Sequence, residues 1–209
     1  MNRSKVAIIS PLIIIGLGFI AAFLFSKLIN EWAFIPLALL YWGGSFAVSY
    51  RFLGRELFLQ LFARPQGKAV WPVICIIAGF IPLPILLMNL DLLNSFTLII
   101  LWLIFSAVNP FFEEIYWRGF LLTALPFSKS LAVVYSTLLF ILSHPLMWGV
   151  FSVANRSWMT WVSLLIMGIV WSLTFIKTKS LRWCIASHIL VDIFNLSVFV
   201  FLNIYVPPM

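Results

Sequence analysis

The chain has 209 residues, of which 64% are hydrophobic and only 9% are charged, and its mean hydropathy is +1.13. A soluble domain typically carries about 25% charged residues, so this composition excludes an ordinary soluble globular protein. The formal net charge is +7, but the basic residues flank apolar segments, a placement that sets orientation in a membrane. We therefore expect an integral membrane protein that does not bind nucleic acid.

Apolar segments suited to crossing a bilayer recur along the whole chain. A transmembrane helix needs about 20 mainly apolar residues, so the pattern predicts an all-α polytopic bundle of about seven spanning helices. It forms one integral membrane domain over residues 1–209. The segments are 6–26, 31–50, 69–88, 95–124, 130–150, 158–176 and 181–205.

Three of these regions carry further signals. The run from Val6 to Phe25 is too long for the apolar core of a signal peptide and lacks a small-residue cleavage site, so it predicts a first spanning helix. The third segment contains several prolines and should be kinked. The basic stretch 51–68 interleaves polar and apolar residues, which is typical of a short amphipathic helix in the membrane interface.

The basic residues predict the orientation of the chain. If the N-terminus is cytoplasmic, ten lysines and arginines lie on the cytoplasmic side and two on the other, a strong positive-inside bias. We expect a bacterial plasma-membrane protein with a cytoplasmic N-terminus and an external C-terminus. The ten residues are Arg3, Lys5, Arg51, Arg55, Arg64, Lys68, Lys129, Lys177, Lys179 and Arg182, and the other two are Lys27 and Arg156.

The first polar motif is the segment Asn109–Gly119, which contains adjacent glutamates in an apolar region. A charge near the bilayer centre raises the free energy of membrane insertion by roughly 2.5–3.5 kcal/mol, so we expect such residues to have a function. Glu114 and Arg118 are i,i+4 neighbours and can form an ion pair. Glu113 points about 100° away and is free to act as a general base. The alternative is a purely structural ion pair with one glutamate in a polar crevice.

Two further motifs contain both histidines of the chain. In Phe140–Pro145, His144 either takes part in chemistry or bonds a backbone carbonyl that Pro145 leaves without a helical donor. In the third motif, His188 and Asp192 share a helix face, with Asn195 near one turn further. This pair could orient the histidine, relay a proton, ligate a metal or simply join two helices.

A glutamate and two histidines in one cavity can activate water and stabilise an oxyanion, which suffices for amide hydrolysis without a covalent nucleophile. Neither a G-x-S-x-G motif nor a C-x-x-C pair is present. We expect no cofactor. A zinc ion held by His144, His188, Asp192 and Glu113 stays open, although the H-E-x-x-H motif is absent.

The order Glu-Glu-x-x-x-Arg, Phe-x-x-x-His and His-x-x-x-Asp on successive hydrophobic segments resembles the CPBP family. These are the CAAX-protease and bacteriocin-processing intramembrane proteases, also called Abi. The resemblance spans Glu113 to Asp192 and implies a catalytic core at 109–195. By resemblance, Glu113 is the general base and His144 assists it. His188 and Asp192 stabilise the oxyanion and orient the substrate, with Glu114, Arg118 and Asn195 in support.

Asp192 departs from the pattern of the prenyl-protein branch, which commonly has asparagine there. An ionised aspartate cannot donate a hydrogen bond to an oxyanion. Asp192 must therefore be protonated, orient His188 or bind a cation.

The leading functional hypothesis is an intramembrane endopeptidase acting on a membrane-associated peptide or protein. A non-catalytic bacteriocin-immunity or scaffold protein is the alternative. A proton-coupled transporter comes third, because no inverted repeat is visible. Counting from Arg182, the pair of His188 and Asp192 starts within about two turns of the basic end, so we expect substrate access there, with His144 deeper.

Overall fold

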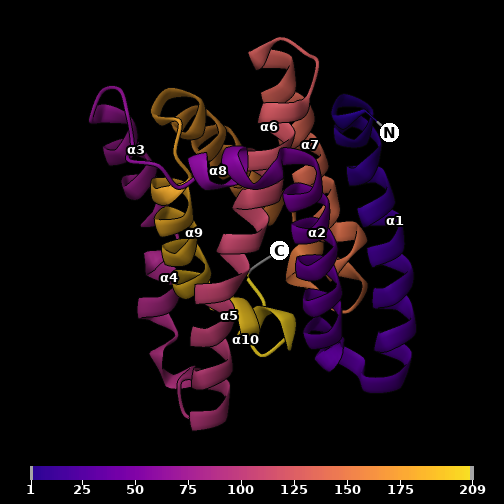
Figure 1. Ribbon diagram of the computed structural model, residues 1–209. Helices are drawn as coiled ribbons and strands as arrows, with labels where there is room; N and C mark the ends of the chain where they lie inside the picture. Colours follow the sequence, from indigo (N-terminus) through magenta and orange to yellow (C-terminus); the bar gives the residue numbers. More distant parts are fainter. Residues whose placement is uncertain (1, 208–209) are drawn as a thin grey trace.

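The computed structural model of the protein describes residues 2–207, which form helices and connecting turns without a β-strand. The helices run antiparallel as seven passes (Figure 1), which confirms an all-α transmembrane bundle of about seven spans. The passes are α1 (Arg3–Ile29), α2 (Phe34–Gln60), α3 (Val70–Gly79) with α4 (Leu83–Met88), α5 (Phe96–Glu114) with the π-helical η3 (Ile115–Phe120) and α6 (Leu121–Ala124), α7 (Lys129–Leu146), α8 (Trp158–Thr178) and α9 (Arg182–Phe194). The short η1 (Asn30–Ala33), η2 (Leu90–Leu92), η4 (Trp148–Val150) and η5 (Ala154–Arg156) occupy the turns.

Five stretches within the described residues are long and apolar enough to cross a membrane, and the first of them, residues 3–60, contains both α1 and α2. The last pass differs from the prediction. In place of one helix over 181–205, α9 ends at Phe194 and α10 (Ser197–Phe201) follows. The break lies at Leu196, whose φ of 57° is in the left-handed region, so the chain turns back instead of continuing outward.

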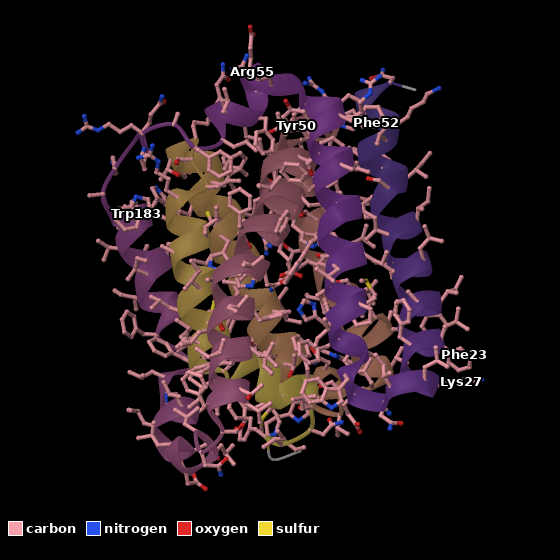
Figure 2. The ribbon with its side chains drawn as sticks, turned by 60° about the horizontal axis from the view of Figure 1, so that its bottom comes forward. Phe23, Lys27, Tyr50, Phe52, Arg55 and Trp183 are labelled. Atoms are coloured by element: carbon pink, nitrogen blue, oxygen red, sulfur yellow. The ribbon has the colours of Figure 1, made fainter. Side chains whose placement is uncertain are left out.

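The predicted kink of the third segment is confirmed, and the second pass has a further kink that was not predicted. The third pass breaks between Gly79 and Leu83, where Pro82 precedes α4. The second pass kinks at Gly54, whose φ of 74° is one that glycine adopts readily. The helix continues to Gln60 within the stretch predicted to lie in the interface, and Arg55 projects at the extremity of the bundle (Figure 2).

The alternation of the passes gives the bundle two ends of different charge. We call the end where α1 begins and α2 ends the basic end, because the ten basic residues of the positive-inside count all lie in its turns or the adjacent helix ends. The opposite, low-charge end carries Lys27 and Arg156 together with Glu31 and Asp91. Arg55 and Lys27 mark these two ends in Figure 2.

Serine side chains start three of the helices that surround the polar motifs. Ser95, Ser128 and Ser157 each accept a hydrogen bond from a backbone N–H in the first turn of α5, α7 and α8. These bonds satisfy amide groups that a helix start leaves unpaired. Within the bundle, α5 packs against α2, α9 and α10, so the glutamate motif lies at its centre.

Candidate active site

The polar centre of the bundle begins with Glu114 at the end of α5. Arg118 Nη1 lies 3.0 Å from Glu114 Oε1, which is the expected i,i+4 ion pair. His188 Nδ1 on α9 lies 2.9 Å from the same oxygen. Because a carboxylate oxygen accepts, Nδ1 carries the hydrogen of this bond. Glu114 therefore links its own helix to α9 and fixes one side of the His188 ring.

Arg118 is almost fully buried, with 1% of its side chain exposed. Its guanidinium carbon lies 4.3 Å from the ring centre of Phe140 on α7 and 5.0 Å from that of Trp171 on α8. Both distances allow cation–π attraction, which is stronger away from water. Together with Glu114, the two rings hold the arginine charge inside the apolar bundle.

The other nitrogen of His188 faces two carboxylates. Nε2 lies 3.5 Å from Glu113 Oε2 and 3.7 Å from Asp192 Oδ1. The imidazole also stacks on Trp171, with ring centres 4.2 Å apart and planes at 21°. These contacts come from α5, α8 and α9, so they hold the ring both in position and in rotation.

Asp192 is held by an amide that the sequence motifs did not assign to the site. Asn109 Nδ2 donates to Asp192 Oδ2 over 3.1 Å, and Trp42 Nε1 on α2 donates to Asn109 Oδ1 over 2.9 Å. An indole N–H only donates, so it determines which end of the Asn109 amide faces Asp192. Asp192 is consequently placed as a hydrogen-bond acceptor, which fits a role in orienting His188.

Each of the two glutamates has one buried carboxylate oxygen without a hydrogen-bond partner within residues 2–207, but only Glu113 lines the cavity described below. The unpaired oxygen of Glu113 is Oε2, and its closest charged neighbour is His188. The adjacent glutamates therefore occupy different environments, one bonded to Arg118 and one facing open space.

His144 lies near the end of α7, where Nδ1 is 2.9 Å from the Phe140 carbonyl oxygen. A carbonyl only accepts, so Nδ1 donates and Nε2 is left for another partner. The bonded carbonyl is that of Phe140 rather than that of Ile141, whose helical donor is the one Pro145 removes. Among the described residues His144 makes no hydrogen bond to Glu113, His188 or Asp192, but it lines the same cavity.

A cavity of about 360 Å³ joins these groups. Glu113, His144, His188 and Asp192 line it, and so does Asn195, which follows α9. The cavity extends toward the low-charge end, whereas the sequence count had suggested access from the basic end. The reason is that α9 ends at Phe194 instead of continuing to residue 205, which leaves space between the polar centre and the low-charge end.

The wall at the low-charge end is made from two segments that hydrogen bonds join. Asn203 donates through Nδ2 to the Phe151 carbonyl and accepts from the Val153 amide, both over 2.8 Å. Ser152 Oγ donates to the Val200 carbonyl over 2.9 Å. We call the two segments, 148–157 and 196–207, the cavity floor.

The side chains considered for zinc do not form a metal site. Among residues 2–207, no group of three or more histidine, cysteine, aspartate or glutamate side chains has a geometry that could hold a metal ion. No step of the reaction proposed below involves a metal.

The three motifs thus meet around one cavity, and the structure adds residues that the motifs missed. Asn109 precedes Glu113 by four residues and shares its helix face, a signal present in the sequence. Trp42 and Trp171 come from other helices, and only the tertiary structure brings them to the site.

Comparison with known proteins gives one match. Residues 95–194 match the family model described as "Type II CAAX prenyl endopeptidase Rce1-like". Neither the curated proteins nor the solved structures yield a match. The matched residues contain all three motifs and most of the polar centre.

Proposed function

Since its residues 95–194 place the chain in the CPBP family, we propose that it is an intramembrane endopeptidase in which Glu113 activates a water molecule. The observation that carries the proposal is the unpaired Oε2 of Glu113, a buried acceptor at the cavity wall 3.5 Å from His188. A protease in a membrane has a peptide or protein as its substrate. The family supports that coarse assignment, and the geometry supports the glutamate mechanism.

In the proposed reaction, Glu113 takes a proton from water while the water oxygen bonds to the substrate carbonyl carbon. The carbonyl oxygen becomes an oxyanion, and the protonated Nε2 of His144 donates to it from the same cavity. The two histidines thereby exchange the roles that the resemblance implies for them, because both nitrogens of His188 face carboxylates. The C–N bond then breaks, and Glu113 delivers the proton to the leaving nitrogen. His188 lies beside Glu113 and positions it, while Asp192 and Glu114 position His188.

The orientation belongs to the same proposal. One end carries ten basic residues, and the other carries two basic and two acidic residues. This asymmetry supports a cytoplasmic location for the basic end. The N-terminus would then be cytoplasmic in a bacterial plasma membrane.

Cleavage of a mixture of apolar synthetic peptides by the purified protein, followed by mass spectrometry, tests the mechanism. Glu113→Gln keeps the size of the side chain but removes its basicity, so we expect cleavage to fall by about 10²-fold or more. Glu56→Gln, at the basic end of the bundle, is the matched control and should cleave at the wild-type rate. Wild-type cleavage by Glu113→Gln would contradict the proposal.

A further inference from the structure

The polar centre is closed toward the basic end. All six residues of η3 are buried, and they cover the site on that side. Leu61 and Leu181 pack over Gly119, where a Cβ would approach them to 2.7 and 3.2 Å. The Leu181 amide also donates to the Leu61 carbonyl over 2.8 Å, which ties the two chain segments together. Within the described residues, no group of the basic-end turns lines the cavity.

The cavity is open in the other direction. Its wall includes Met159, Thr160 and Ser163 from the first turns of α8, and Tyr205 from the cavity floor. Met159 is 41% exposed, and the other three are partly exposed. These residues define a mouth near the low-charge end.

The mouth also reaches the side of the bundle. α3 packs against both α8 and α9, whereas α4, beyond the break at Pro82, packs against α9. Ile85 on α4 and Leu164 on α8 both line the cavity. The break in the third pass therefore separates α4 from α8 in the half of the membrane that is closer to the low-charge end.

The chemistry of the wall limits what can enter. Apart from Glu113, His144, His188 and Asp192, the lining residues of the described chain are uncharged. The polar ones are amides and hydroxyls such as Asn155 and Ser163, and the others include Phe105, Trp148 and Phe201. Away from the four ionisable groups, a charged side chain would lose its hydration in the cavity without gaining a partner of opposite charge.

We infer that the substrate is an apolar, uncharged peptide segment that reaches the site from the extracytoplasmic half of the membrane, through the mouth between α4 and α8. That the entering peptide is a substrate rests on the proposed function. That it enters from the extracytoplasmic side rests on the positive-inside orientation. The substrates would then be exported or membrane-inserted peptides rather than cytoplasmic chains.

Cysteine labelling in intact cells tests the side of access. Cys75 and Cys184 are both fully buried, so the native chain serves as the blank for a membrane-impermeant maleimide. We expect Thr160→Cys and Met159→Cys to be labelled in intact cells. Arg64→Cys, exposed at the basic end, should be labelled only after the cells are opened. The reverse pattern would overturn the inference.

Two measurements on purified protein complete the test. Labelling Thr160→Cys with a bulky maleimide should reduce peptide cleavage by at least about tenfold, because even 1.4 kcal/mol of lost transition-state binding has that effect. Labelling Arg64→Cys should leave the rate unchanged. Replacing an apolar residue several positions from the scissile bond by lysine, where the cavity wall is uncharged, should slow cleavage by a similar factor, and equal rates would refute the apolar substrate.

The failures of the two proposals are distinguishable. If Glu113→Gln still cleaves peptides, the mechanism fails whatever the labelling shows. If cleavage depends on Glu113 but Thr160→Cys is labelled only in opened cells, the mechanism stands and the side of access is wrong.

Discussion

At the scale of single residues, Asp192 lies where a chain of hydrogen bonds from α2 meets the imidazole of α9. The indole of Trp42 fixes the amide of Asn109, and that amide binds one carboxylate oxygen of Asp192. The other oxygen faces His188 Nε2 at 3.7 Å. Asn109 is thus a positioning residue whose effect on the reaction passes through Asp192 and His188.

An exchange of the two side chains tests this positioning role. Asn109→Asp places two carboxylates against each other, and we expect about tenfold or greater loss of kcat together with a lower Tm, because burying an unpaired acceptor costs roughly 1–3 kcal/mol. The double variant Asn109→Asp/Asp192→Asn restores an amide–carboxylate bond, so its Tm should recover.

In the double variant the charge no longer faces His188 directly, so the pH profile of kcat should differ from that of the wild-type protein. Leu190→Ile, on the same helix as Asp192 and outside the cavity wall, is the control. An Asn109→Asp variant with wild-type kcat, Tm and pH profile would show that Asn109 does not position the site.

The residues that could be predicted are those that helical periodicity relates. The pair of Glu114 and Arg118 and the common face of His188 and Asp192 follow from a spacing of four, and the structure places both pairs as expected. The contact of His188 with Glu114 joins residues 74 positions apart. Such a contact depends on how α5 and α9 pack, which a single sequence does not specify.

At the scale of elements, the packing of α3 on α9 holds the histidine helix in place. A Cβ at Gly79 would lie 2.9 Å from the Ser187 carbonyl oxygen, a backbone atom next to His188. Ser187 Oγ in turn donates to the Cys75 carbonyl and accepts from the Trp171 indole. The close approach of the two helices therefore requires glycine at this position.

Gly79→Ala should push α9 away from α3. We expect a loss of about 1–3 kcal/mol of stability from overpacking and a several-fold loss of peptide cleavage, because His188 moves with Ser187. The control is Gly43→Ala on α2, where nothing lies within 4 Å of the added Cβ. Thermal unfolding in detergent compares the stability of the two variants, and equal Tm values would contradict the packing argument.

The elements that the sequence did not predict are those where tertiary contacts override the local pattern. Residues 181–205 are mainly apolar and indicate one helix, yet the chain breaks at Leu196 and returns over the cavity. Likewise, residues 115–120 contain no proline and were predicted as part of one continuous helix, but they form a π-helical turn in which every residue is buried. Packing around Arg118 and Gly119 stabilises a π-helical turn that local helix propensity alone would not favour.

At the scale of the whole molecule, the site is larger than the segment that matches the family. α2 supplies Trp42, and residues 195–207 supply part of the cavity wall. Both lie outside residues 95–194. The second pass is therefore part of the polar centre as well as an anchor in the membrane.

Separate expression of the two parts tests this dependence. Membrane helices can insert individually and then associate, so co-expression of 1–66 with 67–209 should restore peptide cleavage. The piece 67–209 alone should have at most about a tenth of the wild-type activity, because losing the bond from Trp42 to Asn109 is expected to cost on the order of 1–1.5 kcal/mol. A fully active 67–209 piece would argue against any contribution of α2.

The hydrogen-bonded cavity floor has a consequence for inhibition. The segments 148–157 and 196–207 hold each other through Asn203 and Ser152, so the wall opposite the catalytic groups has a defined shape. A cavity of about 360 Å³ accommodates a small drug-like molecule. A stiff apolar compound with one cationic group directed at Glu113 would bind a preformed surface, and little affinity would be lost to ordering the protein.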